Sequence, residues 1–310
     1  MTTDTQALIV ETEESISDAA KGPCRRMIGN FVESKLAVGG LVVFAIVLLV
    51  AIFAPLISPQ NPYDLAQLDI MDGRLEPGEV SMTTGMTFWL GTDDQGRDLL
   101  SGIFYGLRIS LSVGVSSAFI ALFIGGSLGL LGAYFGGRTD TIIMRIVDIQ
   151  LSFPAILIAL ILLAVLGQGV DKIIVALIVT QWAYYARTVR SSALVERGKE
   201  YMEAASCLAL GPRRIVFNHL LPNCMPPLIV VVTMRVAYAV ALEATLSFLG
   251  MGLPITEPSL GLLIANGFEY MLSGKYWISF FPGIALLVTV VSINLVGDHL
   301  RDILNPRLQR

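Results

Sequence analysis

The stretch LAVGGLVVFAIVLLVAIFAPLI, residues 36–57, carries no charged side chain from end to end. The hydrocarbon core of a bilayer is about 30 Å thick, and an α-helix crosses it with roughly 20 apolar residues. The stretch therefore predicts a transmembrane helix. It follows a polar, acidic N-terminal segment and is too long for the apolar region of a secretory signal peptide, so we expect no such peptide.

The composition of the whole chain agrees with a membrane protein. Hydrophobic residues make up 54% of its 310 residues and charged residues only 15%, and the mean hydropathy is +0.70. A soluble domain carries roughly a quarter of charged residues, so lipid must cover part of this surface. The net charge is −4 and no basic stripe is present, which excludes a nucleic-acid-binding protein. Cys24, Cys207 and Cys224 lack the spacing of metal ligands or of a disulfide framework.

Five further apolar stretches extend the prediction along the chain. In the third apolar stretch of the chain, Ile142–Leu166, Arg145 and Asp148 stand three residues apart, where they can pair on one helix face. The fifth apolar stretch, Leu228–Leu249, contains Arg235 and Glu243. We expect an all-α membrane protein with six transmembrane helices. The five stretches are Ile109–Phe135, Ile142–Leu166, Ile173–Ala186, Leu228–Leu249 and Tyr276–Val296. Because Ile173–Ala186 is short, we expect its helix to begin near Gly169 or to continue past Arg187 into the cytosol.

The second of the six stretches is rich in glycine. Gly125 and Gly129, and again Gly132 and Gly136, stand four residues apart, which is the spacing at which membrane helices approach closely. We expect this face to pack within the subunit; a moving or inter-subunit interface is the alternative.

Positive side chains predict the orientation. With the N-terminus in the cytoplasm, the cytoplasmic segments carry about three times as many Lys and Arg as the outer segments. We therefore expect a multi-pass protein of the bacterial inner membrane with both termini in the cytoplasm. The predicted parts are a cytoplasmic tail (1–35) and a membrane domain (36–310), with an outer segment (58–108) and a cytoplasmic loop (188–225).

The cytoplasmic loop contains YMEAASCLALGPRRIVFNHLLPN, residues 201–223. Its first residues are good helix formers, and Gly211-Pro212 breaks the helix before a second amphipathic stretch begins. Glu203, Ala204 and Ala205, with Leu220 and Pro222 seventeen and nineteen residues after Glu203, resemble the EAA loop of binding-protein-dependent ABC importer permeases. Ala209 departs from that pattern, which has glycine there; Gly211 follows two residues later.

A second motif narrows the resemblance. WLGTDDQGRD, residues 89–98, is similar to the signature of the dipeptide, oligopeptide and nickel permeases, and LSFLGMG (246–252) and GDHLRD (297–302) match the C-terminal third of that family. Leu260 stands where the family usually has Trp, and Asn305 where it usually has Asp. The resemblance covers residues 36–310 and is strongest to the C-type member of the permease pair.

The resemblance implies a type I ABC importer permease bundle that is not itself an enzyme. The loop residues Glu203, Ala204, Ala205, Ala209, Gly211, Leu220 and Pro222 would couple it to ATPase subunits. The expected partners are a homologous permease subunit, two ABC ATPases, an extracytoplasmic binding protein and the lipid bilayer. We expect no cofactor in this chain, because ATP and Mg would be bound by the ATPases.

Charged and polar residues outside the loop give two further candidate sites. Asp93, Asp94, Arg97 and Asp98 precede the second helix, where they form either a charged rim of the outer mouth or an ion-paired turn capped by Asp98. Arg235, Glu243 and Gln181 lie in predicted spans, and intramembrane charges usually face the bundle interior or a wet cavity. They line the pathway, or Arg235 and Glu243 form a structural pair.

A secondary carrier and an intramembrane hydrolase are the alternatives to an importer permease. A secondary carrier needs its own ion sites and often has two inverted halves, which the sequence does not show. An intramembrane hydrolase needs a nucleophile and a base within the spans. The chain has no P-loop, and His219 and His299 have no ligand partners nearby in sequence. We expect an importer permease for di- or oligopeptides; nickel or another small solute is the alternative cargo.

Overall fold

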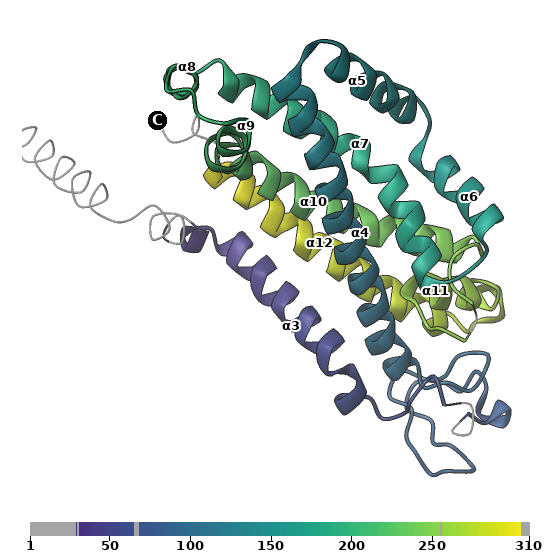
Figure 1. Cartoon of the computed structure of the whole chain (residues 1–310). Helices are drawn as coiled ribbons and strands as arrows, with labels where there is room; N and C mark the ends of the chain where they lie inside the picture. Colours follow the sequence, from purple (N-terminus) through teal and green to yellow (C-terminus); the bar gives the residue numbers. More distant parts are fainter. Residues whose placement is uncertain (1–28, 30, 65–67, 255, 305–310) are drawn as a thin grey trace, which may run out of the picture.

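The computed structural model describes residues 29, 31–64, 68–254 and 256–304, and the regular elements of these residues are helices (Figure 1). Most of the predicted tail (1–35) and Asn305 lie outside this range. The main helices are α3 (Lys35–Ile57), α4 (Leu99–Phe135), α5 (Gly137–Ser152), α6 (Ala155–Leu166), α7 (Val170–Arg197), α8 (Glu200–Cys207), α9 (Pro212–Arg214), α10 (Leu221–Phe248), α11 (Leu260–Phe268) and α12 (Trp277–Leu304). The π-helical stretch η3 (Ile215–Leu220) joins α9 to α10, and η2 (Ile70–Asp72) and η4 (Met271–Ser273) are short 3₁₀ turns.

Four helical runs among the described residues are long and apolar enough to cross a membrane. They are α3, α4, the run Pro212–Phe248 and α12, and the bent pair α5–α6 would make a fifth. The prediction of six spans is therefore not confirmed. Helix α4 begins ten residues before the predicted Ile109 because Arg108 interrupts the apolar pattern but not the helix.

The prediction of one continuous helix over Ile142–Leu166 is wrong. Helices α5 and α6 meet at an angle of 89° across Phe153-Pro154. Proline lacks the N–H that would continue the helix, and it forces the preceding residue out of the α region. Phe153 is accordingly extended, with φ −100° and ψ 142°.

Helix α7 packs against α4, α5, α6 and α10. Two glycines bring α4 against it. A Cβ on Gly125 would lie 2.1 Å from the carbonyl oxygen of Trp182, and one on Gly129 would lie 2.4 Å from that of Ala186. The prediction that this glycine face packs within the subunit is confirmed. Because neighbouring helices cover α7, it tolerates polar residues such as Gln181, and its sequence is less apolar than that of a lipid-facing helix.

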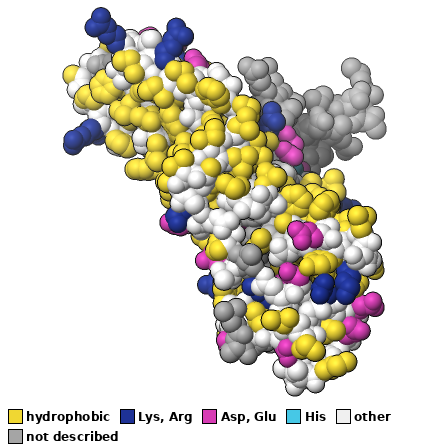
Figure 2. Space-filling model, turned by 90° about the vertical axis from the view of Figure 1, so that its right-hand side faces the viewer, with side chains coloured by type: hydrophobic (Ala, Val, Ile, Leu, Met, Phe, Trp, Pro, Cys, Tyr) yellow, Lys and Arg dark blue, Asp and Glu magenta, His cyan; other side chains and the backbone are white. Residues whose placement is uncertain are grey.

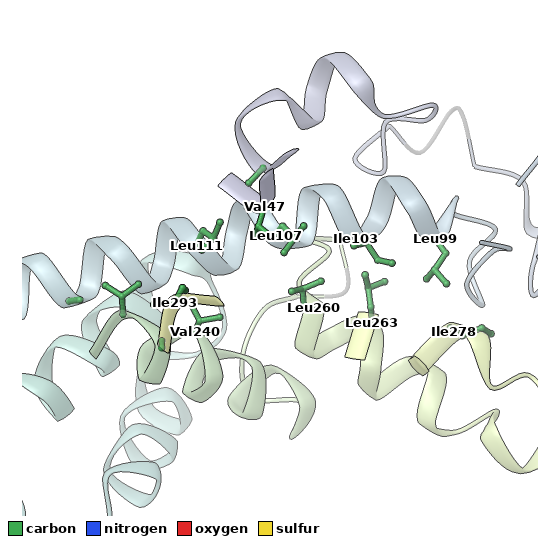
Figure 3. Close-up of a cluster of buried hydrophobic side chains, with 14 of the residues drawn as sticks. Val47, Leu99, Ile103, Leu107, Leu111, Val240, Leu260, Leu263, Ile278 and Ile293 are labelled. Carbon is green, nitrogen blue, oxygen red and sulfur yellow. The ribbon is translucent and has the colours of Figure 1, made fainter. Parts of the chain in front are cut away.

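A hydrophobic core lies between α3, α4, α10, α11 and α12. Figure 3 shows Leu99, Ile103, Leu107 and Leu111 following one face of α4 at four-residue spacing, opposite α10 and α11. This packing fixes α11, a helix that the sequence analysis did not predict.

The surface retains large exposed apolar side chains. Along α3 they include Leu36, Ile46, Ile52 and Leu56. Figure 2 shows hydrophobic side chains over the upper middle of one face, with charged side chains toward the two ends. Soluble monomers rarely expose a continuous apolar area of this kind, so it indicates a surface covered by lipid or by partner subunits.

The two motif-bearing segments lie at opposite ends of the bundle. Figure 1 shows α8 and α9 at one end and the chain between α3 and α4, residues 58–98, at the other. This placement is what a protein needs if it is to contact different partners on the two sides of a membrane.

Candidate functional site

The predicted coupling loop begins with α8. Ala205 and Met202 are buried against the bundle, whereas Glu203, Ala204, Cys207 and Leu208 are exposed. The helix therefore presents one face to the bundle and one face to the outside, as a docking helix requires. We find the break at Gly211 as predicted: Gly211 precedes α9, and Pro212 is its first residue, a position where the missing N–H costs nothing.

Helix α8 ends in a left-handed turn at Ala209, where φ is +51°. The N–H of Leu210 donates to the carbonyl oxygen of Ala205, 3.3 Å away, across this turn. This is the Schellman arrangement, in which glycine is preferred at the left-handed position because it has no Cβ. The departure noted at Ala209 thus falls on the one residue of the loop where alanine is strained.

The second half of the loop is anchored to the bundle. Leu220 is fully buried and packs in a cluster with Ala193 of α7 and with Cys224 and Leu228 of α10. Pro222 is exposed at the start of α10. A push on α8 can therefore reach α10 through continuous helix from α9 onward.

A pocket of about 650 Å³ separates α8 from the end of α4. Arg197 of α7 lines it and donates from Nη1 to the carbonyl oxygen of Ala133, 2.8 Å away. The other lining residues are Tyr134, Phe135, Met202, Glu203, Cys207, Ile215 and Leu220.

The outer motif forms a closed turn before α4. Asp93 is fully buried, and its Oδ1 accepts from the N–H groups of Gln95 and Arg97, both at 2.9 Å. Burial raises the pKa of the Asp93 carboxyl to about 6, although the two N–H donors and the Arg97 charge oppose the rise. Arg97 is 2% exposed, and no carboxylate of the described residues lies within 4 Å of it; Asp94 is half-buried.

Asp98 caps α4, as one of the two alternatives predicted. The ion pairing that the same alternative predicted for this turn is wrong, because no carboxylate of the described residues pairs with Arg97. Its Oδ2 accepts from the N–H and from the hydroxyl of Ser101, at 2.9 and 2.6 Å. Gln60, just after α3, accepts from the Asp98 N–H at 2.7 Å and donates its own N–H to Ser101 at 3.1 Å. Burial raises the pKa of Asp98 against these hydrogen bonds. The motif thereby ties the start of α4 to the end of α3.

Glu243 lies fully buried between α4 and α10. Its two carboxylate oxygens accept from the hydroxyls of Ser110 and Ser247, at 2.7 and 2.8 Å. Glu243 therefore forms no pair with Arg235, and that structural alternative is wrong. Gln181 is also fully buried, and its amide nitrogen and oxygen have no hydrogen-bond partner among the described residues.

Arg235 stacks on aromatic rings instead. Its guanidinium carbon lies 3.5 Å from the centroid of Tyr184 and 5.2 Å from that of Tyr238. A guanidinium over an aromatic ring is attracted by the negative face of the ring's quadrupole. A role of Arg235, Glu243 or Gln181 in the pathway stays a prediction.

Two ion pairs join α5 to α7. Asp148 pairs with Arg187, and Asp140 pairs with Arg190. The predicted pairing of Asp148 with Arg145 is wrong, because Asp148 meets a cation of the neighbouring helix. Sequence reasoning missed these two arginines and Ser110, since they lie 39 to 133 residues away from the charge they meet. It also missed Ser247, although that residue is only four positions from Glu243 on the same helix. Within the part of the chain that the structure describes, no group of His, Cys, Asp or Glu is arranged to hold a metal ion.

Comparison with known proteins assigns the family. Residues 125–310 match the family of binding-protein-dependent transport system inner membrane components, and residues 22–77 match the N-terminal transmembrane domain of oligopeptide transport permease C. The di/tripeptide permease DppC of Pseudomonas aeruginosa is 36% identical over 93% of each chain, and the oligopeptide permease OppC of Bacillus subtilis is 36% identical over 96% of this chain and 94% of that protein.

The fold has a counterpart among solved structures. An inward-facing structure of the MetNI methionine ABC transporter aligns with a TM-score of 0.54 and 23% identity, over 67% of this chain and 98% of that one. At that identity the likeness concerns the fold alone. The sequence relatives and the family match carry the assignment: this chain belongs to the binding-protein-dependent transport system inner membrane components, the permeases of ABC importers.

Proposed function

We propose that this chain is the C-type permease subunit of an ABC importer for di- or oligopeptides and forms half of its translocation pathway. The observation that carries the proposal is the placement of α8 at one end of the bundle, with Glu203 and Ala204 exposed, in a chain of this family. The peptide cargo is supported by the names of the relatives, which are di/tripeptide and oligopeptide permeases.

In this proposal the membrane domain (36–310) crosses the inner membrane six times. The broken pair α5–α6 and the covered helix α7 complete the four apolar spans; α7 has 28 residues, about 42 Å, which is long enough to cross. Both termini and the loop 188–225 lie in the cytoplasm, and the segment 58–108 lies outside. The distribution of Lys and Arg supports this orientation.

The proposed partners are a homologous permease, two ABC ATPases that bind ATP and Mg, and an extracytoplasmic binding protein. Closure of the ATPases would push on the exposed face of α8. Because the chain runs from α9 through η3 into α10 without a break, the push would turn α10 against the neighbouring permease. Residues 58–98, tied to α3 and α4 through Gln60 and Asp98, would meet the binding protein at the other end.

Reconstitution of the complete complex in proteoliposomes tests the proposal. Uptake of a labelled dipeptide should require ATP, the ATPases and the loaded binding protein together. Glu203→Lys, which reverses the charge on the exposed face of α8, should lower both uptake and retention of the ATPases. Glu76→Lys makes the same change on an exposed residue at the opposite end and is the control for retention of the ATPases, which it should leave unchanged. Uptake at the full rate without the ATPases would contradict the proposal and favour a secondary carrier.

A further inference from the structure

Arg235 lies near the middle of the 28-residue α10, within a run that is long and apolar enough to span a membrane. Its guanidinium is half-buried between Tyr184 of α7 and Tyr238 of α10, and each tyrosine keeps 39% of its surface exposed. The charge is therefore held at the surface of the bundle at mid-height rather than inside its core.

This charge is not neutralised by the described residues. No carboxylate among them pairs with Arg235, and Glu243, eight residues further along α10, is already bound by two serine hydroxyls. An ionised arginine at the middle of a membrane span is costly when it faces lipid tails. The surface around Arg235 must therefore face water or a polar group.

The stacking leaves the hydrogen-bonding edge of the arginine available. A guanidinium is planar, and its five N–H donors lie in that plane. Because a ring lies over its face at 3.5 Å, the in-plane edge stays free to bind a carboxylate with two parallel hydrogen bonds. Stacking also fixes the side chain in one orientation, which reduces the entropy lost when an anion binds.

Two unpartnered polar side chains lie on α7 close in sequence to Tyr184, the residue on which Arg235 stacks. The hydroxyl of Tyr185, the residue after Tyr184, is buried and has no hydrogen-bond partner among the described residues. Gln181, one turn away on the same helix, has both amide atoms buried and unpartnered. Buried polar atoms are rarely left unsatisfied, so these groups indicate a place where water or a polar solute belongs.

We propose that Arg235, held between Tyr184 and Tyr238, is a subsite of the translocation pathway that binds the carboxylate of the passing solute. For a peptide cargo this carboxylate is the C-terminal one, so the inference rests on the proposed function and adds a specificity-determining residue to it. Lysine would keep the charge but not the planar, stacked donor pair.

Uptake of a dipeptide and of its C-terminal amide by the reconstituted complex tests the subsite. Both cargoes are supplied at concentrations that saturate the binding protein, and each variant is compared with wild type for each cargo, so selection by the binding protein cancels. Arg235→Gln should lower uptake of the acid about tenfold and leave uptake of the amide within about twofold. Arg235→Lys should restore part of the preference for the acid. Arg145→Gln removes an exposed cation of α5 that takes no part in the stacking of Arg235, and it should change the uptake of neither cargo.

The other outcomes overturn the inference in distinguishable ways. Equal losses for acid and amide in Arg235→Gln would show that Arg235 is structural. Loss of the partner permease on purification of that variant would show that Arg235 pairs with a carboxylate of the neighbouring subunit. Both results leave the proposed function standing. A wild-type complex that moves no peptide at all would overturn the peptide cargo and the subsite together.

Discussion

The N–H of Leu210 donates to the carbonyl oxygen of Ala205, and this bond closes α8 over a left-handed Ala209. The helix that would meet the ATPase thus ends at a strained alanine. The turn has the geometry of a glycine-terminated helix end, so the strain comes from the side chain and not from the fold.

Ala209→Gly should stabilise the end of α8. Glycine adopts positive φ without the clash of a Cβ, and the gain should be about 0.5 to 1 kcal/mol after the larger entropy loss of glycine. Hydrogen exchange at the Leu210 amide should slow about threefold to fivefold. Ala204→Gly is the matched control: Ala204 lies inside the same helix, so the same substitution should speed exchange. Equal effects of both variants would contradict the assignment of the turn.

Gly125→Ala should destabilise the bundle. Its Cβ would lie 2.1 Å from the carbonyl oxygen of Trp182, so α4 and α7 must separate, at a cost of about 1 to 3 kcal/mol. The neighbouring Gly126→Ala places its Cβ 3.8 Å from Val189, an ordinary contact, and should cost little. Thermal unfolding in detergent should separate the two variants by several degrees; coinciding curves would argue against the close approach of the helices.

The outer segment should lose stability as the pH rises. The pKa of Asp93 is about 6 in the folded chain and 3.8 ordinarily, so the folded state binds the extra proton between these values. The free energy of unfolding of the segment is then highest below about pH 4 and falls by up to about 3 kcal/mol as the pH rises to about 6. Above that pH it stays constant.

Hydrogen exchange of residues 68–98 between pH 4 and 7, corrected for the intrinsic rate, measures this change. Asp93→Asn keeps the oxygen that accepts from Arg97 and removes the titration, so its profile should be nearly flat. Asp98, whose pKa is also raised, accounts for any slope that remains. A wild-type segment that becomes more stable from pH 4 to 6 would contradict the prediction.

Glu243→Ala should cost about 2 to 4 kcal/mol, because it leaves a cavity and deprives two buried serine hydroxyls of their acceptor. Glu243→Gln keeps the volume and can exchange hydrogen bonds with both hydroxyls, so its unfolding midpoint should stay close to that of wild type. If Glu243→Gln unfolds normally but transport is lost, Glu243 acts in the pathway rather than in packing.

The apolar runs and the residues at their ends correctly predicted helix α3, the end of α4 and the cap of α4. Helix α3 was placed to within one residue, because it is uniformly apolar and because Ser34 caps it in the structure. The end of the second span, Phe135, was also correct: Gly136, with φ +64°, follows it. The capping role of Asp98 could be read from its place before an apolar run.

Other features depend on packing and could not be read in the same way. Helix α7 begins at Val170, beside Gly169, and runs eleven residues beyond Ala186, so both predicted extensions are confirmed. How far it runs could not be predicted, because the helices around it remove the need for apolar side chains. The break at Pro154 had a local signal, but the continuous apolar pattern on both sides outweighed it. The partners of Asp148, Glu243 and Arg235 come from other helices or other turns, and one sequence does not reveal such pairings.

Photocrosslinking from two positions tests the central claim most directly. A crosslinking amino acid at Leu208, which directly follows α8 and is 74% exposed, is compared with one at Met82, which is 96% exposed in the outer segment at the opposite end. We predict that Leu208 captures a protein with a P-loop and that Met82 does not. Capture of the P-loop protein from Met82, or of none from Leu208 in a complex that imports peptide on ATP, would contradict the proposed coupling through α8.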